Sequence, residues 1–567
     1  MEGIPNAPRP PLQEADKKPA GEEPVPDNFK NYDYVIVGAG SAGAVLAARL
    51  SEDRDVSVLL LEAGGRDLNP LIKIPLAFGK VWAFPSITWQ FASEPEPALY
   101  GRSLVVNRGR VLGGSSSING MIHVRGNRAD YDLWRQSGLE GWSFADVLPY
   151  FKKMETHWRG PGPYHGGDGP LAVSRMEGGS LMDDVFAKTA AAAGVPYCAD
   201  YNGAEQDGFS TSEATIGRGR RQSTATTYLA QAHGRSNLTI QTRALVNRVL
   251  LDKNRAIGVE YQHGNDKIWV YAKREVVLSG GAYNSPQLLM LSGIGPASHL
   301  NEVGIKVQHD LPGVGQNLSE HPNFAVAFKA RGTESSTRDL RLDRAAFQVL
   351  NWAFTGKGVF STNNTAGNIY HRSLPGLARP DIQVIFTTLN LDSGLWFPGI
   401  TRPPVYRYTA RGGLLHPESR GWVKLRSDDP RDKPRIFFNM FGEQADLDTM
   451  IRAIRYSREL FTHKPLADRV ERELSPGPKL QTDAEIGDFL RRTVSHRHHP
   501  VGTCTMGTGP QAVVDAQLRV RGIEGLRVVD ASVMPDEPSG NTNIPTIMIA
   551  EKAADMIRGR ALPPAED

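Results

Sequence analysis

The feature that most constrains this chain is a glycine-rich turn between an apolar stretch and a helical one. Residues 33–37 (Asp-Tyr-Val-Ile-Val) predict a buried strand, and residues 42–50 predict a helix. Gly38 permits the tight turn, Gly40 lets the backbone approach a pyrophosphate, and Gly43 allows helix and strand to pack closely. The helix N-terminus offers free N–H groups and the positive end of its dipole to phosphates. This pattern predicts a dinucleotide-binding loop.

A second strand supports that interpretation. Residues 56–61 (Val-Ser-Val-Leu-Leu-Leu) end at Glu62, nineteen residues after Gly43. A carboxylate at this place accepts hydrogen bonds from an adenosine ribose. A glycine turn alone would fit an ordinary α/β protein, but strand, turn, helix, second strand and acid together favour nucleotide binding. The acid disfavours a 2′-phosphate, which leaves FAD and NAD as candidate cofactors.

Composition and charge exclude several classes of function. The 567 residues suffice for two substantial domains or one large composite domain. A net charge of +3 gives no reason to expect nucleic acid as a partner. The two cysteines, Cys198 and Cys504, are too few for a disulfide framework and lack metal-site spacing. No apolar run is long enough to span a membrane, so we expect a soluble chain, cytoplasmic or at most peripheral to a membrane.

The first thirty residues differ from the rest of the chain. Residues 1–30 contain seven prolines and many charged residues but no apolar stretch. This composition predicts a disordered tail and not an intact signal peptide. Removal of a signal peptide before Met1 stays open at this point.

A second glycine-rich loop lies further along the chain. Residues 109–120 hold four glycines, three serines and one asparagine. Backbone N–H groups and short side-chain donors at close range suit the ribityl, pyrophosphate or ring edge of a flat cofactor. A surface loop is the alternative, but apolar residues in and beside the loop indicate burial. Buried polar groups would then need a ligand to satisfy them.

This loop resembles the first signature of the glucose-methanol-choline (GMC) family of FAD-dependent oxidoreductases, in its alcohol dehydrogenase and choline dehydrogenase-like branch. Residues 281–295 resemble the second signature and follow a predicted strand at residues 275–279. Both signatures, the opening loop and a His-Pro pair at residues 499–500 occur in the family's order. The resemblance implies an α/β (α+β composite) fold, in which a Rossmann-like FAD-binding domain carries an antiparallel-sheet substrate domain.

The resemblance also implies how the chain is divided. The predicted segments are 1–30, a disordered Pro-rich tail; 31–180, the first part of the FAD-binding domain with its lid; 181–320, mainly returning FAD-binding segments; 321–490, mainly the substrate-binding domain; and 491–567, a C-terminal FAD-domain segment with the catalytic pair.

FAD is the cofactor that the resemblance implies, bound without a covalent link. Members with covalent FAD carry a histidine where this chain has Ile118. We therefore expect FAD that is bound non-covalently and can dissociate. Val246 is a candidate by resemblance alone, because the backbone there contacts the adenine in relatives. The candidate FAD-binding residues are Gly38, Gly40, Ser41, Ala42, Gly43, Glu62, Arg110, Gly113, Gly114, Ser115, Asn119, Gly120, Met121, Ile122, Val246, Asp530, Ala531, Asn543, Pro545 and Thr546.

Three histidines in four residues precede the C-terminal end of the chain. His496, His498 and His499 have a spacing that is poor for a metal site, and no carboxylate or thiolate stands beside them, so we predict no metal. In the family, the histidine directly before Pro-x-Gly-Thr is the catalytic base, and here that is His499. His496 is predicted to lie at the surface. Asn541 stands where relatives place a histidine or asparagine that binds the substrate oxygen, and an amide can donate to an alkoxide without competing for its proton.

These residues predict FAD-dependent oxidation of a primary alcohol, aliphatic or aromatic, to an aldehyde. His499 removes the hydroxyl proton, and N5 of the flavin accepts the hydride. A non-redox lyase on the same scaffold, a choline-type dehydrogenase and a nicotinamide-dependent dehydrogenase are the alternatives. Choline is disfavoured because Ala366 aligns near the glutamate that pairs with its ammonium group in choline-specific relatives. The electron acceptor is oxygen or a quinone, and both stay open at this point.

Overall fold

The structure is a computed structural model that describes residues 30–176, 182–389, 392–401 and 404–566. The tail predicted at residues 1–30 lies outside the described residues except for Lys30, which begins the first strand. None of the helices in the described ranges combines the length and apolar character that crossing a membrane requires.

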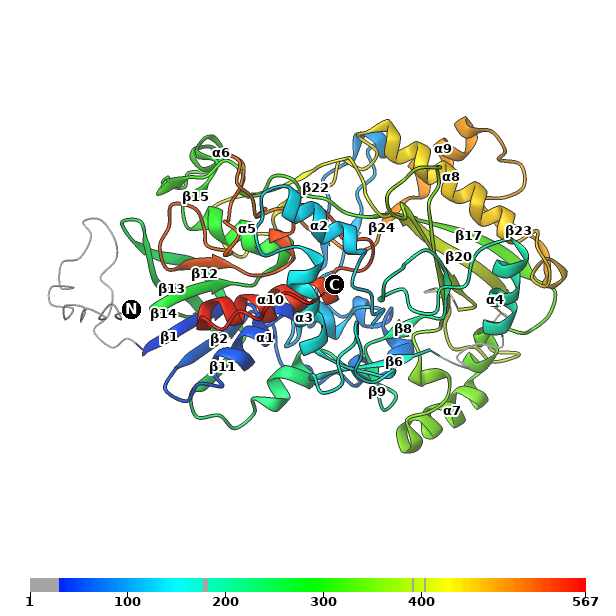
Figure 1. Cartoon of the computed structure of the whole chain (residues 1–567), viewed down its shortest axis with the longest axis horizontal. Helices are drawn as coiled ribbons and strands as arrows, with labels where there is room; N and C mark the ends of the chain where they lie inside the picture. The colour runs from blue at the N-terminus through cyan, green and yellow to red at the C-terminus, as the bar shows by residue number, and fades with distance from the viewer. Residues whose placement is uncertain (1–29, 177–181, 390–391, 402–403, 567) are drawn as a thin grey trace.

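Within the described ranges, two seven-stranded sheets dominate the molecule, toward opposite ends of its long axis (Figure 1). The first sheet has the order β11-β2-β1-β14-β13-β12, with β25 also paired to β14. β11, β2, β1, β14 and β25 pair in parallel, as a Rossmann-like unit requires, whereas β12, β13 and β14 pair antiparallel. Its strands are β1 (Lys30–Val37), β2 (Val58–Glu62), β11 (Leu238–Thr242), β12 (Ala244–Asp252), β13 (Arg255–His263), β14 (Asp266–Leu278) and β25 (Leu526–Val528).

The opening turn has the predicted geometry. Gly38 adopts a φ of 98°, and a Cβ there would lie 2.4 Å from the carbonyl oxygen of Ser279. A Cβ on Gly43 would lie 1.9 Å from the carbonyl oxygen of Gly38. Larger residues at either position would force the helix away from the sheet. Helix α1 (Ser41–Leu50) therefore begins directly at the carboxyl end of β1.

The second sheet is antiparallel, with the order β23-β17-β20-β19-β18-β7 and β24 paired to β17. Alternate residues of its central strands face opposite ways. Val384, Phe386 and Ala410 belong to a core shared with helix α8 (Gln444–Leu460), whereas Ile385 and Arg411 line a cavity on the other face. The strands are β7 (Gly208–Ser210), β17 (Pro322–Ala330), β18 (Thr365–His371), β19 (Ile382–Thr387), β20 (Arg407–Leu414), β23 (Val470–Ser475) and β24 (Ser495–His496).

The predicted composite of a Rossmann-like domain and an antiparallel-sheet domain is confirmed. The chain passes between the sheets more than once: β7 joins the second sheet, and helix α4 (Asp183–Ala192) packs beside it. Both lie in the range 181–320, which was predicted to be mainly FAD-binding. The remaining α-helices in the described ranges are α2 (Arg128–Gln136), α3 (Phe144–Lys153), α5 (Gly281–Leu291), α6 (Ala297–Glu302), α7 (Leu342–Thr355), α9 (Asp483–Thr493) and α10 (Asn543–Arg558).

Short strands complete the structure. They are β3 (Phe91–Ala92), β4 (Val105–Val106), β5 (Glu155–His157), β6 (Leu171–Arg175), β8 (Glu213–Ala214), β9 (Ile216–Gly217), β10 (Arg220–Arg221), β15 (Ile294–Gly295), β16 (His309–Asp310), β21 (Trp422–Lys424) and β22 (Arg435–Phe437).

The two ends of the described chain meet at helices α1 and α10, drawn in blue and red in Figure 1. Glu551 of α10 is buried and accepts hydrogen bonds from Arg49 of α1, at 2.7 Å from Nη2 and 2.9 Å from Nε. The Tyr228 hydroxyl donates to the same carboxylate at 2.7 Å. This pair joins segments that lie 502 residues apart in the sequence.

We expect Glu551→Gln to lower the free energy of unfolding by about 3 kcal/mol, because Arg49 would lose the charge that compensates its own burial. Circular dichroism during thermal unfolding measures this loss as a lower midpoint. Glu52→Gln is the matched control, since Glu52 pairs with the same arginine at 2.9 Å on the exposed side. Its cost should be below about 1 kcal/mol. An equal loss of the free energy of unfolding in the two variants would contradict the stabilising role of the buried contact between Glu551 and Arg49.

Candidate active site

A cavity of about 1280 Å³ extends from the glycine turn of the first sheet to the inner face of the second sheet. Sixteen of the predicted FAD-binding residues line it, and so do both residues of the predicted catalytic pair. Those sixteen are Gly38, Gly40, Ser41, Ala42, Glu62, Gly114, Ser115, Asn119, Gly120, Met121, Ile122, Val246, Asp530, Ala531, Asn543 and Thr546.

Four predicted cofactor residues do not line this cavity. Gly43 packs α1 against the turn, and Gly113 adopts a φ of 83° next to Ser117. Arg110 stacks its guanidinium over the ring of Trp89 at 4.7 Å, and Pro545 is buried in the first turn of α10. These residues lie behind the residues that line the cavity.

The end of the cavity near β2 fits an adenosine. Glu62 accepts hydrogen bonds from the backbone N–H groups of Ala39 at 3.0 Å and Gly64 at 2.8 Å, so its carboxylate is held in place. Burial raises the pKa of Glu62 to about 7, although these two hydrogen bonds oppose the shift. Gly40 and Gly114 face each other so closely that a Cβ on Gly114 would lie 2.6 Å from the Cα of Gly40. No side chain of these two glycines therefore covers the backbone where a pyrophosphate would lie.

Two helix N-termini converge on the same cavity. Neither α1 nor α10 has a side-chain cap, so their first N–H groups stay available to a bound group. The Ser41 hydroxyl at the start of α1 donates to Oδ1 of Asn543 at the start of α10, at 2.7 Å. Asp530 accepts from the N–H of Gly281 at 2.9 Å, which fixes the end of β25 beside α5.

The predicted catalytic pair is in contact. Nδ2 of Asn541 lies 2.8 Å from Nε2 of His499, and Oδ1 of Asn541 is buried without a hydrogen-bond partner among the described residues. Burial holds the pKa of His499 well below its usual value, and the neighbouring His321 and Arg497 lower it further. His499 is therefore neutral at physiological pH and can accept a proton.

A chain of hydrogen bonds decides which nitrogen of His499 carries its proton. Nε2 of His321 lies 2.8 Å from the carbonyl oxygen of Leu415, and a carbonyl only accepts, so this nitrogen is protonated. Nδ1 of neutral His321 then accepts from Nδ1 of His499, 3.0 Å away. The lone pair of His499 is left on Nε2, where it faces Asn541 and the cavity. Burial keeps the pKa of His321 well below its usual value, which preserves this arrangement.

Sequence reasoning missed His321 and its neighbour Glu320. The carboxylate of Glu320 accepts from the backbone N–H of His499 at 2.8 Å. Both residues stand in a short polar run before β17, and the pairing of β17 with β24 and the bridge from Ser319 to Val501 bring them to the histidine segment. A histidine next to an acid at the start of a strand was the one available signal.

Two predictions were wrong. His496 is not at the surface: it is buried, and its Nε2 lies 2.9 Å from the carbonyl oxygen of Val105. Ala366 does not face the cavity, because the register of β18 turns it into the core of the second sheet. Its identity therefore carries no information about choline.

A profile described as GMC oxidoreductase matches residues 32–323, and a second profile of the same description, for the C-terminal part, matches residues 417–550. This chain belongs to the GMC oxidoreductase family. It is accordingly an FAD-dependent enzyme that acts on CH–OH donors, and the prediction of FAD rather than NAD is confirmed.

Relatives match nearly the whole GMC chain. Mitochondrial choline dehydrogenase of Mus musculus is 44% identical over 551 residues, which cover 94% of this chain and 90% of the relative. Oxygen-dependent choline dehydrogenase of Chromohalobacter salexigens is 43% identical over 535 residues, with coverage of 93% and 95%. Among solved structures, pyridoxine 4-oxidase from Mesorbium loti superposes with a TM-score of 0.84 at 33% identity, covering 93% of this chain and 99% of that one.

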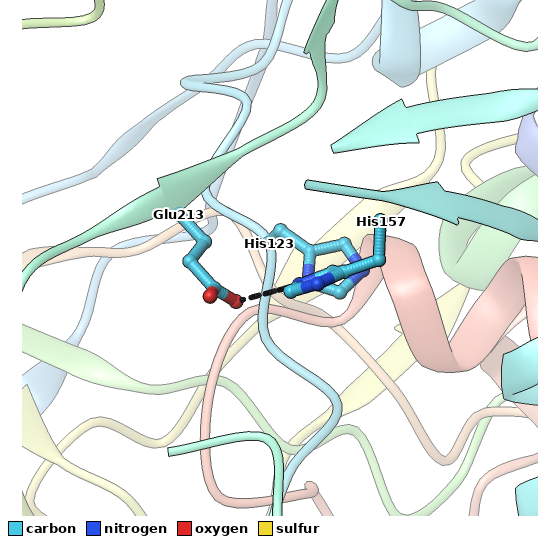
Figure 2. A group of neighbouring side chains, drawn as sticks. All are labelled: His123, His157 and Glu213. Carbon is cyan, nitrogen blue, oxygen red and sulfur yellow. Dashed lines mark hydrogen bonds and ion pairs between the residues drawn. The ribbon is translucent and has the colours of Figure 1, made fainter. Parts of the chain in front are cut away.

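The GMC scaffold also holds a buried cluster of histidines and acids that the sequence analysis did not identify. Figure 2 shows His123, His157 and Glu213 close together, with 3.3 Å between Nε2 of His157 and Oε2 of Glu213. Their ligand atoms lie within 4.8 Å of one another, which is a spacing that could hold a metal ion. The residues are spread from position 123 to 213, so no short motif marks them.

Protein groups already engage the carboxylates of this cluster. Glu213 accepts from Asn202 at 3.0 Å and from the indole of Trp158 at 2.8 Å. The adjoining Glu155 pairs with Arg125 at 2.6 Å. Burial acts to raise the pKa of Glu155, but Arg125 and the neighbouring histidines outweigh it and hold that pKa well below the usual range. We infer a structural hydrogen-bond network, because donors compete with a metal for the same oxygens.

We expect dialysis against EDTA to leave both the melting temperature and the flavin content unchanged. Circular dichroism and flavin absorbance measure these two quantities, with bound metal counted by mass spectrometry. A lower melting temperature that zinc restores would contradict the structural interpretation.

Proposed function

We propose that this GMC oxidoreductase oxidises a primary alcohol, aliphatic or aromatic, to an aldehyde. The observation that carries the proposal is the contact of 2.8 Å between the unprotonated Nε2 of His499 and Asn541 at the wall of the cavity. A neutral base and an amide donor at one point are the groups that an alcohol hydroxyl needs.

In the proposed reaction, Nε2 of His499 takes the hydroxyl proton, and Nδ2 of Asn541 donates to the substrate oxygen. Loss of that proton makes departure of a hydride from the α-carbon easier. Bound FAD supplies the acceptor for that hydride. The hydrogen bond from His499 to His321 keeps the ring oriented while Nε2 gains its proton.

The predicted cofactor residues would hold FAD along the cavity without a covalent bond. Glu62 would accept from the ribose, Gly40 and Gly114 would leave room for the pyrophosphate, and the N-terminus of α10 would face the flavin ring. Ile118, in place of the histidine of covalent members, is buried and offers no nucleophile.

A choline-type dehydrogenase is the second candidate, because the relatives named choline dehydrogenase match more than 90% of this chain. Choline carries an ammonium group that could pair with a carboxylate. Among the described residues, the carboxylates that line the cavity are Glu62, Asp432 and Asp530. Glu62 and Asp530 are engaged by backbone N–H groups near the first sheet, and Asp432 binds Ser427. Comparing choline with the uncharged 3,3-dimethylbutanol, which has the same shape, separates the two candidates.

Oxygen or a quinone is the proposed electron acceptor. Reoxidation of the alcohol-reduced enzyme by air, and by a quinone-like dye under argon, separates an oxidase from a dehydrogenase. This comparison does not depend on the identity of the alcohol.

We expect His499→Ala to keep its FAD but to lose alcohol oxidation by about 10²–10⁴-fold, because no other group takes the proton. Bleaching of the bound flavin under argon measures the effect. His498→Phe is the matched control, since it changes the adjacent cavity-lining histidine and leaves the chain from His321 to Asn541 intact. Near-normal bleaching by His499→Ala would refute the proposal.

We expect FAD to bind more weakly as the pH falls below about 7. A charged Glu62 carboxylate accepts from the ribose more strongly than the neutral acid, and its pKa is about 7 in the FAD-free protein. Below that pH, the tighter binding requires release of a proton, so the dissociation constant should rise by up to about tenfold per pH unit. Glu62→Gln should weaken binding by about 10–100-fold and abolish this dependence. Glu302→Gln, at an exposed carboxylate, is the control, and an unchanged slope in Glu62→Gln would count against the role.

A further inference from the structure

Two arginines stand on the cavity side of the second sheet, close to the proposed base. Arg411 lies on β20, where it pairs across the sheet with Ile385. Arg497 precedes His499 by two residues, and its Nη2 donates to Oε1 of Gln383 at 2.5 Å. Gln383 and Ile385 are alternate residues of β19 and so share one face, which places the two guanidinium groups on neighbouring rows.

Neither guanidinium is fully satisfied. Nε of Arg411 and Nη1 of Arg497 are buried and have no hydrogen-bond partner among the residues that the structure describes. Burial lowers the pKa of Arg497 to about 10, and it also lowers that of Arg411. Both side chains therefore stay charged at neutral pH, although isolated buried charges are costly.

The nearby carboxylates compensate these charges only in part. Asp392, whose charge acts on Arg411, is paired with Arg407. The charge of Glu320 acts on Arg497 while its carboxylate accepts from the N–H of His499, and burial together with Glu320 raises the pKa of Glu537 well above its usual value. Two cations thus line the cavity, and each keeps one buried donor without a protein partner among the described residues.

Apolar residues line much of the cavity near these arginines, together with polar ones such as Thr387 and Asn364. The residues that line it from α7 and the neighbouring segments include Ala345, Val349, Leu350, Phe360 and Leu389. An alcohol that binds here would rest its carbon chain on these residues, while a charged end could reach the arginines.

We propose that the substrate is an alcohol that also carries a carboxylate, which binds between Arg411 and Arg497 while the hydroxyl lies at His499. A guanidinium matches a carboxylate in shape and hydrogen-bond geometry. Leu415, which holds His321, is four residues beyond Arg411, or about 13 Å along an extended strand. The side chain of Arg411 can extend over part of this distance. The substrate would cover the rest, so several carbons would separate its carboxylate from its hydroxyl. A quaternary ammonium at this wall would meet like charges.

This inference rests on the proposed alcohol oxidation, so its first test measures binding alone. Isothermal calorimetry on the FAD-loaded enzyme compares hexanoate with hexanamide, which are alike in length and differ in charge. Hexanoate should bind at least about tenfold more tightly. Arg411→Gln should abolish the preference, and Arg411→Lys should restore part of it. Arg455→Gln is the control, since Arg455 lies on α8 and pairs with Asp483 at the exposed surface.

A second test measures the reaction. Under argon, 6-hydroxyhexanoate should bleach the flavin with a KM at least about tenfold lower than 1-hexanol, and Arg411→Gln should remove the difference. Equal binding of hexanoate and hexanamide to the wild-type enzyme would overturn the proposal, even if 1-hexanol bleaches the flavin. Arg411-dependent binding of hexanoate without bleaching by any alcohol would support the anion site and refute the proposed function instead.

Discussion

The contact between α1 and α10 is the constraint on which the rest of the active site depends. Glu551 is buried against Arg49 and Tyr228, and the Ser41–Asn543 hydrogen bond joins the starts of the same helices. Because both N-termini then open on one cavity, the glycine turn at the beginning of the chain and the proposed catalytic pair near its end line the same cavity. A looser contact would separate the two ends of that site.

Burial shifts the pKa values of the groups at the two ends of the cavity in opposite directions. It raises the pKa of Glu62 to about 7 and holds that of His499 well below its usual value. In each case desolvation favours the neutral form. In the proposed function, a neutral histidine is what proton abstraction requires, whereas a charged Glu62 would accept hydrogen bonds from a ribose more strongly than the neutral acid. Cofactor binding and chemistry should therefore respond differently to pH.

The two faces of the second sheet have different roles, one in the core and one at the cavity. The face with Val384, Phe386 and Ala410 packs on α8 and supplies a core. The opposite face carries Arg411 and Ile385 into the cavity. A shift of register by one residue would exchange these roles, since successive side chains alternate. Relatives named choline dehydrogenase share the scaffold, and under our proposal the side chains on this wall decide which alcohol binds.

The sequence by itself determined the glycine turn, the acid at Glu62 and the two signatures, because each depends on local backbone geometry or on a short motif, and the family resemblance made His499 and Asn541 the candidate pair. It could not place His496 or Ala366, whose environments depend on strands paired across distant parts of the chain. Only the tertiary structure joined Leu415, His321 and His499 into one hydrogen-bond chain and set Arg411 beside Arg497. Those contacts arise from strand register and burial, and these follow from how the whole chain packs rather than from neighbouring residues.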